Sequence, residues 1–79
     1  MPRVAFLGDV VFREPTIGSE VWFASASRLF DTESFETFVL LRAFSLSMPQ
    51  DKLPDPVDEQ AVTKGIHDFK VSLAFATMP

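Results

Sequence analysis

The stretch Phe35–Met48, which reads FETFVLLRAFSLSM, is the longest apolar segment of this 79-residue chain and lies near its middle. Any hydrophobic core of the protein has to be built on it. A strand over 36–47 would be apolar on both faces, as a central strand is, and its Phe, Val, Thr and Ser content favours that structure. A helix over 33–46 is the alternative, because the apolar side chains also recur at helical spacing: Phe35, Phe38, Val39, Ala43 and Leu46.

Arg42 interrupts the apolar face in both interpretations of this stretch. A charge in such a segment has to reach solvent, pair with an acid, or point at a partner. The simplest pairing is with Glu36 or with an acid of a neighbouring strand. Since arginine is enriched in protein interfaces, Arg42 is also a candidate partner-binding residue.

Three further segments are predicted to be strands because their apolar residues alternate. The first is 3–13, where Gly8 marks a bulge, and the second is 20–30, joined to it by a turn over 14–19. The short link predicts antiparallel pairing. The segment 69–77 has the clearest alternation in the chain, with one apolar and one mixed face.

A short helix is predicted over 56–64, after a loop that contains three prolines in eight residues. Asp55 would cap it, with Pro56 at its first position. Lys64 would lie in the last turn, and Gly65 would end the helix. The predicted fold class is therefore α+β, a single small domain over 1–79 with a mostly antiparallel sheet of three to four strands (3–13, 20–30, 36–47, 69–77) and one short helix. In the alternative, the helix over 33–46 packs on a three-stranded sheet.

The composition excludes several kinds of chemistry. The chain has no cysteine and one histidine, so it forms no disulfide and cannot assemble a His- or Cys-based metal site by itself. Its net charge of −4 disfavours direct nucleic-acid binding. The central apolar run is too short to cross a membrane, and the first residues lack the apolar core of a signal peptide. We therefore predict a cytoplasmic protein without a cofactor or a membrane association.

The aromatic content is the most unusual feature of the composition. Nine phenylalanines, one tryptophan and no tyrosine are a large apolar load for 79 residues. Either the core consists mostly of Phe side chains, or some rings form a contact patch at the surface. Trp22 is a candidate partner-binding residue for this reason.

No group of residues predicts catalysis. The pair His67–Asp68 could act as a base with its orienting acid, but no nucleophile accompanies it, and a surface turn explains it better. The acids near 51–59 lack the spacing of a calcium loop and are explained by helix capping and solubility. The segments Val4–Gly8 and Arg42–Leu46 only weakly suggest the aromatic strands of an RNA-binding sheet. We therefore expect that the protein is not an enzyme.

Two functions remain. The first is a small interaction module that binds another protein, or a second copy of itself, through a Phe-rich surface or through the sheet edges at 3–13 and 69–77. The second is a compact acidic inhibitor of a nucleic-acid-handling host enzyme, a nucleic-acid mimic comparable in size and acidity to small phage-encoded antagonists. The candidate partner-binding residues for both are Arg42, Trp22, Asp51, Asp55, Asp58 and Glu59.

Overall fold

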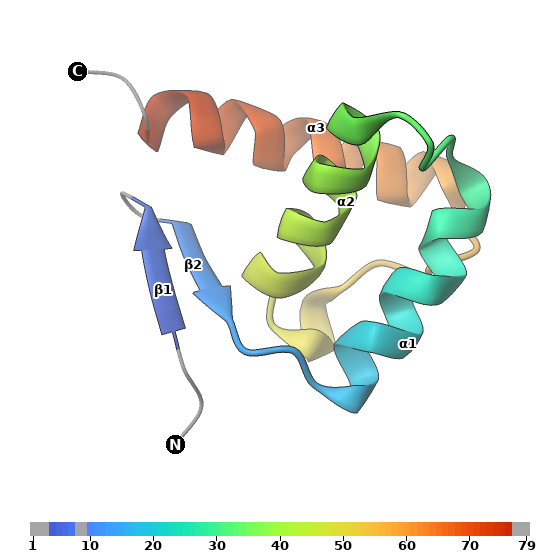
Figure 1. Cartoon of the computed structure of the whole chain (residues 1–79), viewed down its shortest axis with the longest axis horizontal. Helices are drawn as coiled ribbons and strands as arrows, with labels where there is room; N and C mark the ends of the chain where they lie inside the picture. Colours follow the sequence, from blue (N-terminus) through green and yellow to red (C-terminus); the bar gives the residue numbers. More distant parts are fainter. Residues whose placement is uncertain (1–3, 8–9, 77–79) are drawn as a thin grey trace.

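The computed structural model describes residues 4–7 and 10–76, and most of them are helical. A β-hairpin of β1 (Val4–Leu7) and β2 (Val10–Arg13) is followed by three α-helices. These are α1 (Ile17–Ala26), α2 (Phe35–Ser47) and α3 (Glu59–Ala76), with the 3₁₀ turns η1 (Ser27–Leu29) and η2 (Gln50–Lys52) between them. Helix α2 lies in the middle, in contact with β2, α1 and α3 (Figure 1).

This architecture overturns the predicted α+β fold with a sheet of three to four strands. Within the described residues the only sheet has two strands, and it lies in the segment 3–13. Its strands pair antiparallel, from Val4 opposite Arg13 to Leu7 opposite Val10. The expected single strand is therefore a hairpin, and the bulge expected at Gly8 lies outside the described residues.

The strand predicted over 20–30 is wrong, since residues 20–29 are helical, and the start of their helix is capped. The side-chain oxygen of Thr16 accepts a hydrogen bond from the Ser19 backbone N–H at 3.1 Å. The Ser19 hydroxyl oxygen accepts one from the Thr16 backbone N–H at 2.9 Å. This reciprocal capping box satisfies two backbone donors that would otherwise have no partner. The helix therefore begins at Ile17, inside the segment 14–19 that was predicted to be a turn.

The strand predicted over 36–47 is also wrong, since these residues form α2. The alternative, a helix over 33–46, agrees with α2 to within two residues at its start and one at its end. The three-stranded sheet on which it was expected to pack is absent from the described residues. Ser34 caps this helix, and its hydroxyl oxygen accepts from the Thr37 backbone N–H at 3.5 Å.

Helix α3 replaces both the short helix predicted over 56–64 and the strand predicted over 69–77. It is capped by Asp58, whose carboxylate accepts from the Ala61 backbone N–H at 3.2 Å. Its inward side chains follow a helical period that extends through both predicted segments: Val62, Ile66, Phe69, Leu73 and Ala76. The alternation at 69–77 was misleading, because Val71 and Phe75 are exposed.

The core is a row of aromatic rings that joins β2 and the three helices. Phe44 of α2 lies at its centre, with its ring centroid 5.5 Å from Trp22 of α1 and 6.0 Å from Phe69 of α3. Phe69 in turn meets Phe12 of β2 edge-on at 6.4 Å. Leu41 and Val62 are completely buried beside this row. The core is thus centred on the inward face of α2.

Gly65 does not end a helix, as was predicted, but lies inside α3, where Phe44 crosses it. A Cβ atom at this position would lie 2.8 Å from the Cζ atom of the Phe44 ring. The absence of a side chain therefore lets the central ring of the core pack directly on the backbone of α3.

Candidate functional site

Arg42, predicted to contact a partner, lies on the outer side of the contact between α1 and α2. Its guanidinium is 2.5 Å from the carboxylate of Glu20 and lies over the Phe23 ring, 4.9 Å from the centroid. Its side chain is 26% exposed. The acid that pairs with it is therefore Glu20 of α1, whereas Glu36 lies 3.4 Å from Lys70 of α3.

Trp22 lies in the core and not at the surface. Only 6% of it is exposed, and its indole N–H donates a hydrogen bond of 2.7 Å to the carbonyl of Pro54. This hydrogen bond connects α1 to the proline-rich loop that precedes α3. The structural role of Trp22 accounts for both its burial and its one polar atom.

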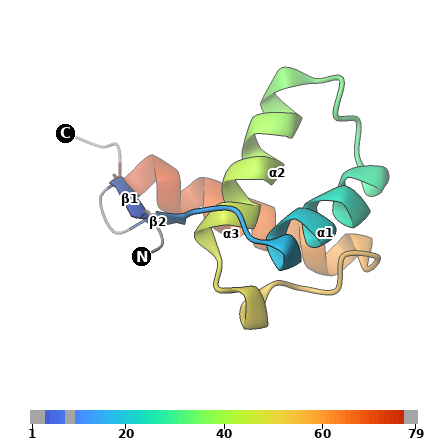
Figure 2. The ribbon, with the colours of Figure 1, turned by 60° about the horizontal axis from the view of Figure 1, so that its bottom comes forward.

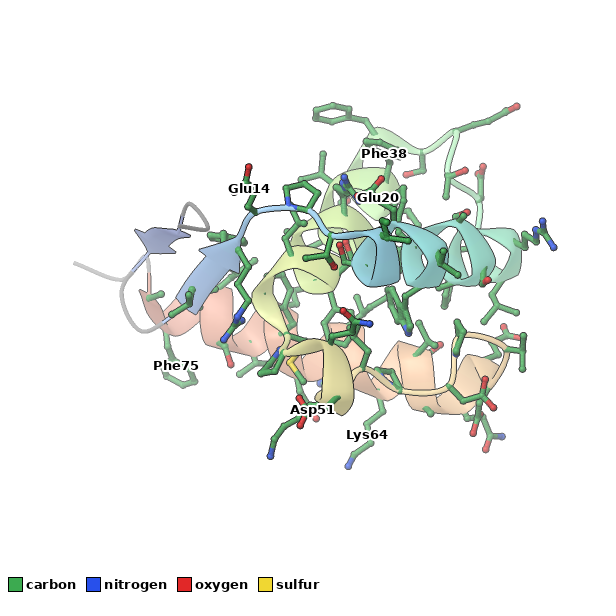
Figure 3. All side chains as sticks on the ribbon, turned by 90° about the horizontal axis from the view of Figure 1, so that it is seen from below. Glu14, Glu20, Phe38, Asp51, Lys64 and Phe75 are labelled. Atoms are coloured by element: carbon green, nitrogen blue, oxygen red, sulfur yellow. The ribbon has the colours of Figure 1, made fainter. Side chains whose placement is uncertain are left out.

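The four acids predicted to contact a partner lie along one segment, from η2 to the first turn of α3. Asp55 accepts a hydrogen bond from the Val57 backbone N–H at 3.1 Å, and Asp58 caps α3. Asp51 and Glu59 are exposed. Figure 3 shows Asp51 on the opposite side of the molecule from Glu20, which binds Arg42, so the predicted partner-binding residues do not form one site.

The pair His67–Asp68 lies on the exposed side of α3, not in a turn before a strand. Adjacent helical residues do not face each other. The segment Arg42–Leu46 is helical, so the pair of aromatic strands considered above does not form. Across residues 4–7 and 10–76, no three His, Cys, Asp or Glu side chains are grouped closely enough to hold a metal ion.

An exposed apolar row on α2 is the first of two surfaces that could bind another molecule. Phe35 is 80% exposed, and Phe38 and Val39 are each 42% exposed. The Phe38 ring meets Phe23 of α1 edge-on, with centroids 5.7 Å apart. We call Phe35, Phe38, Val39, Phe23 and Arg42 the aromatic stripe. The i, i+3, i+4, i+7 spacing of its α2 members is the sequence signal that the helix alternative contained.

The second surface is an open groove of about 930 Å³ between β2, the C-terminal end of α2, η2 and α3. Its apolar lining includes Phe44, Phe69 and the backbone of Gly65, and Phe75 lies at the C-terminal end of α3, 71% exposed. Its charged lining residues are Arg13, Lys52, Lys64 and Asp68. We call it the basic groove. The sequence does not reveal it, because its residues come from four separate segments.

The two surfaces face in opposite directions. In Figure 3, Phe38 of the aromatic stripe and Glu20 lie on one side of the molecule, and Lys64 and Phe75 of the basic groove lie on the other. Among the described residues, no helix is long and apolar enough to cross a lipid bilayer. The chain matches no protein-family model, no curated protein and no solved structure. The two surfaces are therefore the basis for assigning a function.

Proposed function

We propose that this protein is a small non-enzymatic interaction module that binds a partner protein, or a second copy of itself, through the aromatic stripe. The observation that carries the proposal is the exposure of Phe35, Phe38 and Val39 in one row on α2. Large apolar side chains that are grouped at a surface are typical of protein-binding sites. Single exposed apolar residues would need no such explanation.

The stripe also has the composition of an interface centre. Aromatic residues and arginine are enriched among the side chains that contribute most to binding. Arg42 is held in place by Glu20 and by the Phe23 ring, so it loses little conformational freedom when a partner arrives. This arrangement supports a preformed binding surface.

The other routes considered from the sequence have less support. Binding through a sheet edge at 69–77 is contradicted, because residues 69–76 of that segment belong to α3. For the acidic inhibitor, two of the four acids, Asp55 and Asp58, are already engaged by backbone N–H groups. No observation favours that function over the first.

The test compares three proteins as bait for partner capture from the source cells: the wild type, the double variant Phe35→Ser/Phe38→Ser, and the control Val57→Ser. Val57 is 72% exposed but belongs to neither surface, so its variant removes a comparable apolar side chain elsewhere. We expect the wild type and the control to retain the same partner, or a second copy of the chain. The stripe variant should lose it by at least about tenfold.

Circular dichroism establishes that each variant is folded before capture. Phe38 packs against Phe23, so its substitution could destabilise the fold. If the double variant unfolds, the single variant Phe35→Ser takes its place in the capture experiment. Equal retention by all three proteins would overturn the proposal, as would a wild type that binds neither a partner nor itself.

A further inference from the structure

The charges at the basic groove are opposite in sign to those of the chain as a whole. The net charge is −4, yet the groove is lined by Arg13, Lys52 and Lys64 against the single acid Asp68. The chain has seven basic residues; Arg3 lies outside the described residues, so these three are half of the remaining six. The groove is therefore a local region of positive charge with an apolar lining.

Most of this positive charge is not neutralised within the chain. Two other basic residues, Arg42 and Lys70, form ion pairs with Glu20 and Glu36. Lys52 and Lys64 have no carboxylate within ion-pair distance in the part of the chain that the structure describes. Arg13 donates a hydrogen bond to the carbonyl of Ser47, which is neutral. A ligand that combines carboxylates with an apolar side chain would complement the groove.

The turn between η1 and α2 of the same chain combines exposed carboxylates with an exposed apolar side chain. Asp31 and Glu33 are exposed there, and the Asp31 carboxylate accepts a hydrogen bond from the Glu33 backbone N–H at 3.1 Å, which orders the turn. Phe35 follows, 80% exposed in the first turn of α2. We call Asp31, Glu33 and Phe35 the acidic corner. Figure 2 shows this turn at the far end of the molecule from the β-hairpin.

The acidic corner cannot reach the basic groove of its own chain. The corner begins α2 on the side where Phe38 lies, whereas Lys64 and Phe75 of the groove lie on the opposite side (Figure 3). Complementary surfaces that face away from each other on one chain can meet only between two chains. Such a contact is heterologous, because each copy offers one surface to one neighbour and the other surface to the next.

We propose that the acidic corner of one copy docks in the basic groove of a second copy. Phe35 enters beside Phe69 and Gly65, and Asp31 and Glu33 face Lys52 and Lys64 of the neighbour. Repetition of this contact produces chains, or rings if the rotation closes. The inference rests on the proposed function, since Phe35 belongs to the aromatic stripe, and it names the partner as a second copy.

The experiment is sedimentation velocity of the full chain from nanomolar to high micromolar concentration, with two charge-swapped variants. The groove variant is Lys52→Glu/Lys64→Glu, and the corner variant is Asp31→Lys/Glu33→Lys. Each should associate at least about tenfold more weakly than the wild type, because like charges then meet in its contact. Mixing the two variants should restore association, since each mixed contact again joins opposite charges.

The control Asp55→Lys/Glu59→Lys changes the net charge by the same amount as the corner variant, but on another exposed segment. It should associate like the wild type. The restoration on mixing shows that both swapped variants are folded, and Lys64→Glu alone replaces the groove variant if that one unfolds. Added salt should also weaken the association of the wild type.

Three outcomes would overturn the inference: a wild type that is monomeric at every concentration, a mixture that does not associate, and dissociation caused by the control instead of the corner variant. The further inference can fail while the proposed function holds. If Phe35→Ser/Phe38→Ser abolishes binding while both charge swaps leave it unchanged, the aromatic stripe binds protein and the groove is not its receptor.

Discussion

The two faces of α2 have similar side chains but opposite surroundings. Leu41 and Phe44 on the inner face are 0% and 2% exposed, whereas Phe35 on the outer face is 80% exposed. Phe44 on the inner face packs on Trp22 of α1 and Phe69 of α3. On the outer face, Phe38 meets the Phe23 ring and Arg42 pairs with Glu20, both on α1. The core of this small protein therefore covers one side of a helix that is apolar on both.

This difference separates the residues that hold the fold from those that are available for binding. A helix that is apolar all round belongs in a large core or needs a further cover. A chain of this length buries only about 60% of the surface that it exposes when unfolded. The inner face should then contribute mostly to folding stability and the outer face mostly to association.

The largest expected effect comes from truncating one phenylalanine on each face. Phe44→Ala should lower the free energy of unfolding by about 3–5 kcal/mol, because it leaves a cavity between Trp22, Phe69 and Gly65. Phe35→Ala should change it by no more than about 0.5 kcal/mol, because that ring is mostly in solvent. Urea denaturation followed by circular dichroism measures both.

If Phe44→Ala and Phe35→Ala lowered the free energy of unfolding equally, the inner face of α2 would not be the one that holds the fold. Phe44→Leu is a milder variant that leaves a smaller cavity, and it gives a value if Phe44→Ala does not fold. The decrease in the free energy of unfolding for Phe44→Leu should lie between the decreases for Phe44→Ala and Phe35→Ala.

A smaller effect is expected where the inner face of α2 meets α3. In Gly65→Ala the new Cβ would lie 2.8 Å from the Phe44 ring, which Trp22 and Phe69 hold on both sides. The overpacking, about 1–3 kcal/mol, opposes a gain in helix propensity of about 1 kcal/mol. We expect a net loss of about 1 kcal/mol in the free energy of unfolding, measured in the same denaturation series.

Gly18→Ala is the matched control on α1. Its Cβ would meet the end of the Gln50 side chain, which is exposed and can move aside. The gain in helix propensity then remains, and stability should stay constant or rise. A loss in Gly18→Ala as large as in Gly65→Ala would mean that the Phe44 contact is not the cause.

The same two-faced character explains why the sequence predicted α2 as a strand. With apolar residues at both 38 and 39 and at both 40 and 41, neither the helical nor the alternating period stands out. The fold class then followed propensity, which tertiary packing overrides. Capping was the better signal: Ser34 begins α2, and the Thr16–Ser19 pair begins α1.

The predictions for the binding residues were limited in another way. The sequence shows that Arg42 is a charged residue within an apolar stretch. The helix alternative already placed Phe35, Phe38 and Val39 in one row. Nothing in the sequence paired Arg42 with Glu20, 22 positions earlier, or joined the four segments of the basic groove. Such long-range neighbours depend on the packing of α1, α2 and α3.

The smallest expected effect concerns the ion pair that fixes Arg42 on the outer face. A double-mutant cycle of Glu20→Gln and Arg42→Gln should give a coupling of about 0.2–1 kcal/mol in the free energy of unfolding, because both side chains are partly exposed. Added salt should reduce it. A coupling of several kcal/mol, or a total loss comparable to that of Phe44→Ala, would place Arg42 among the residues that hold the fold. A small coupling, combined with weaker partner capture by Arg42→Gln, would keep it on the face that binds.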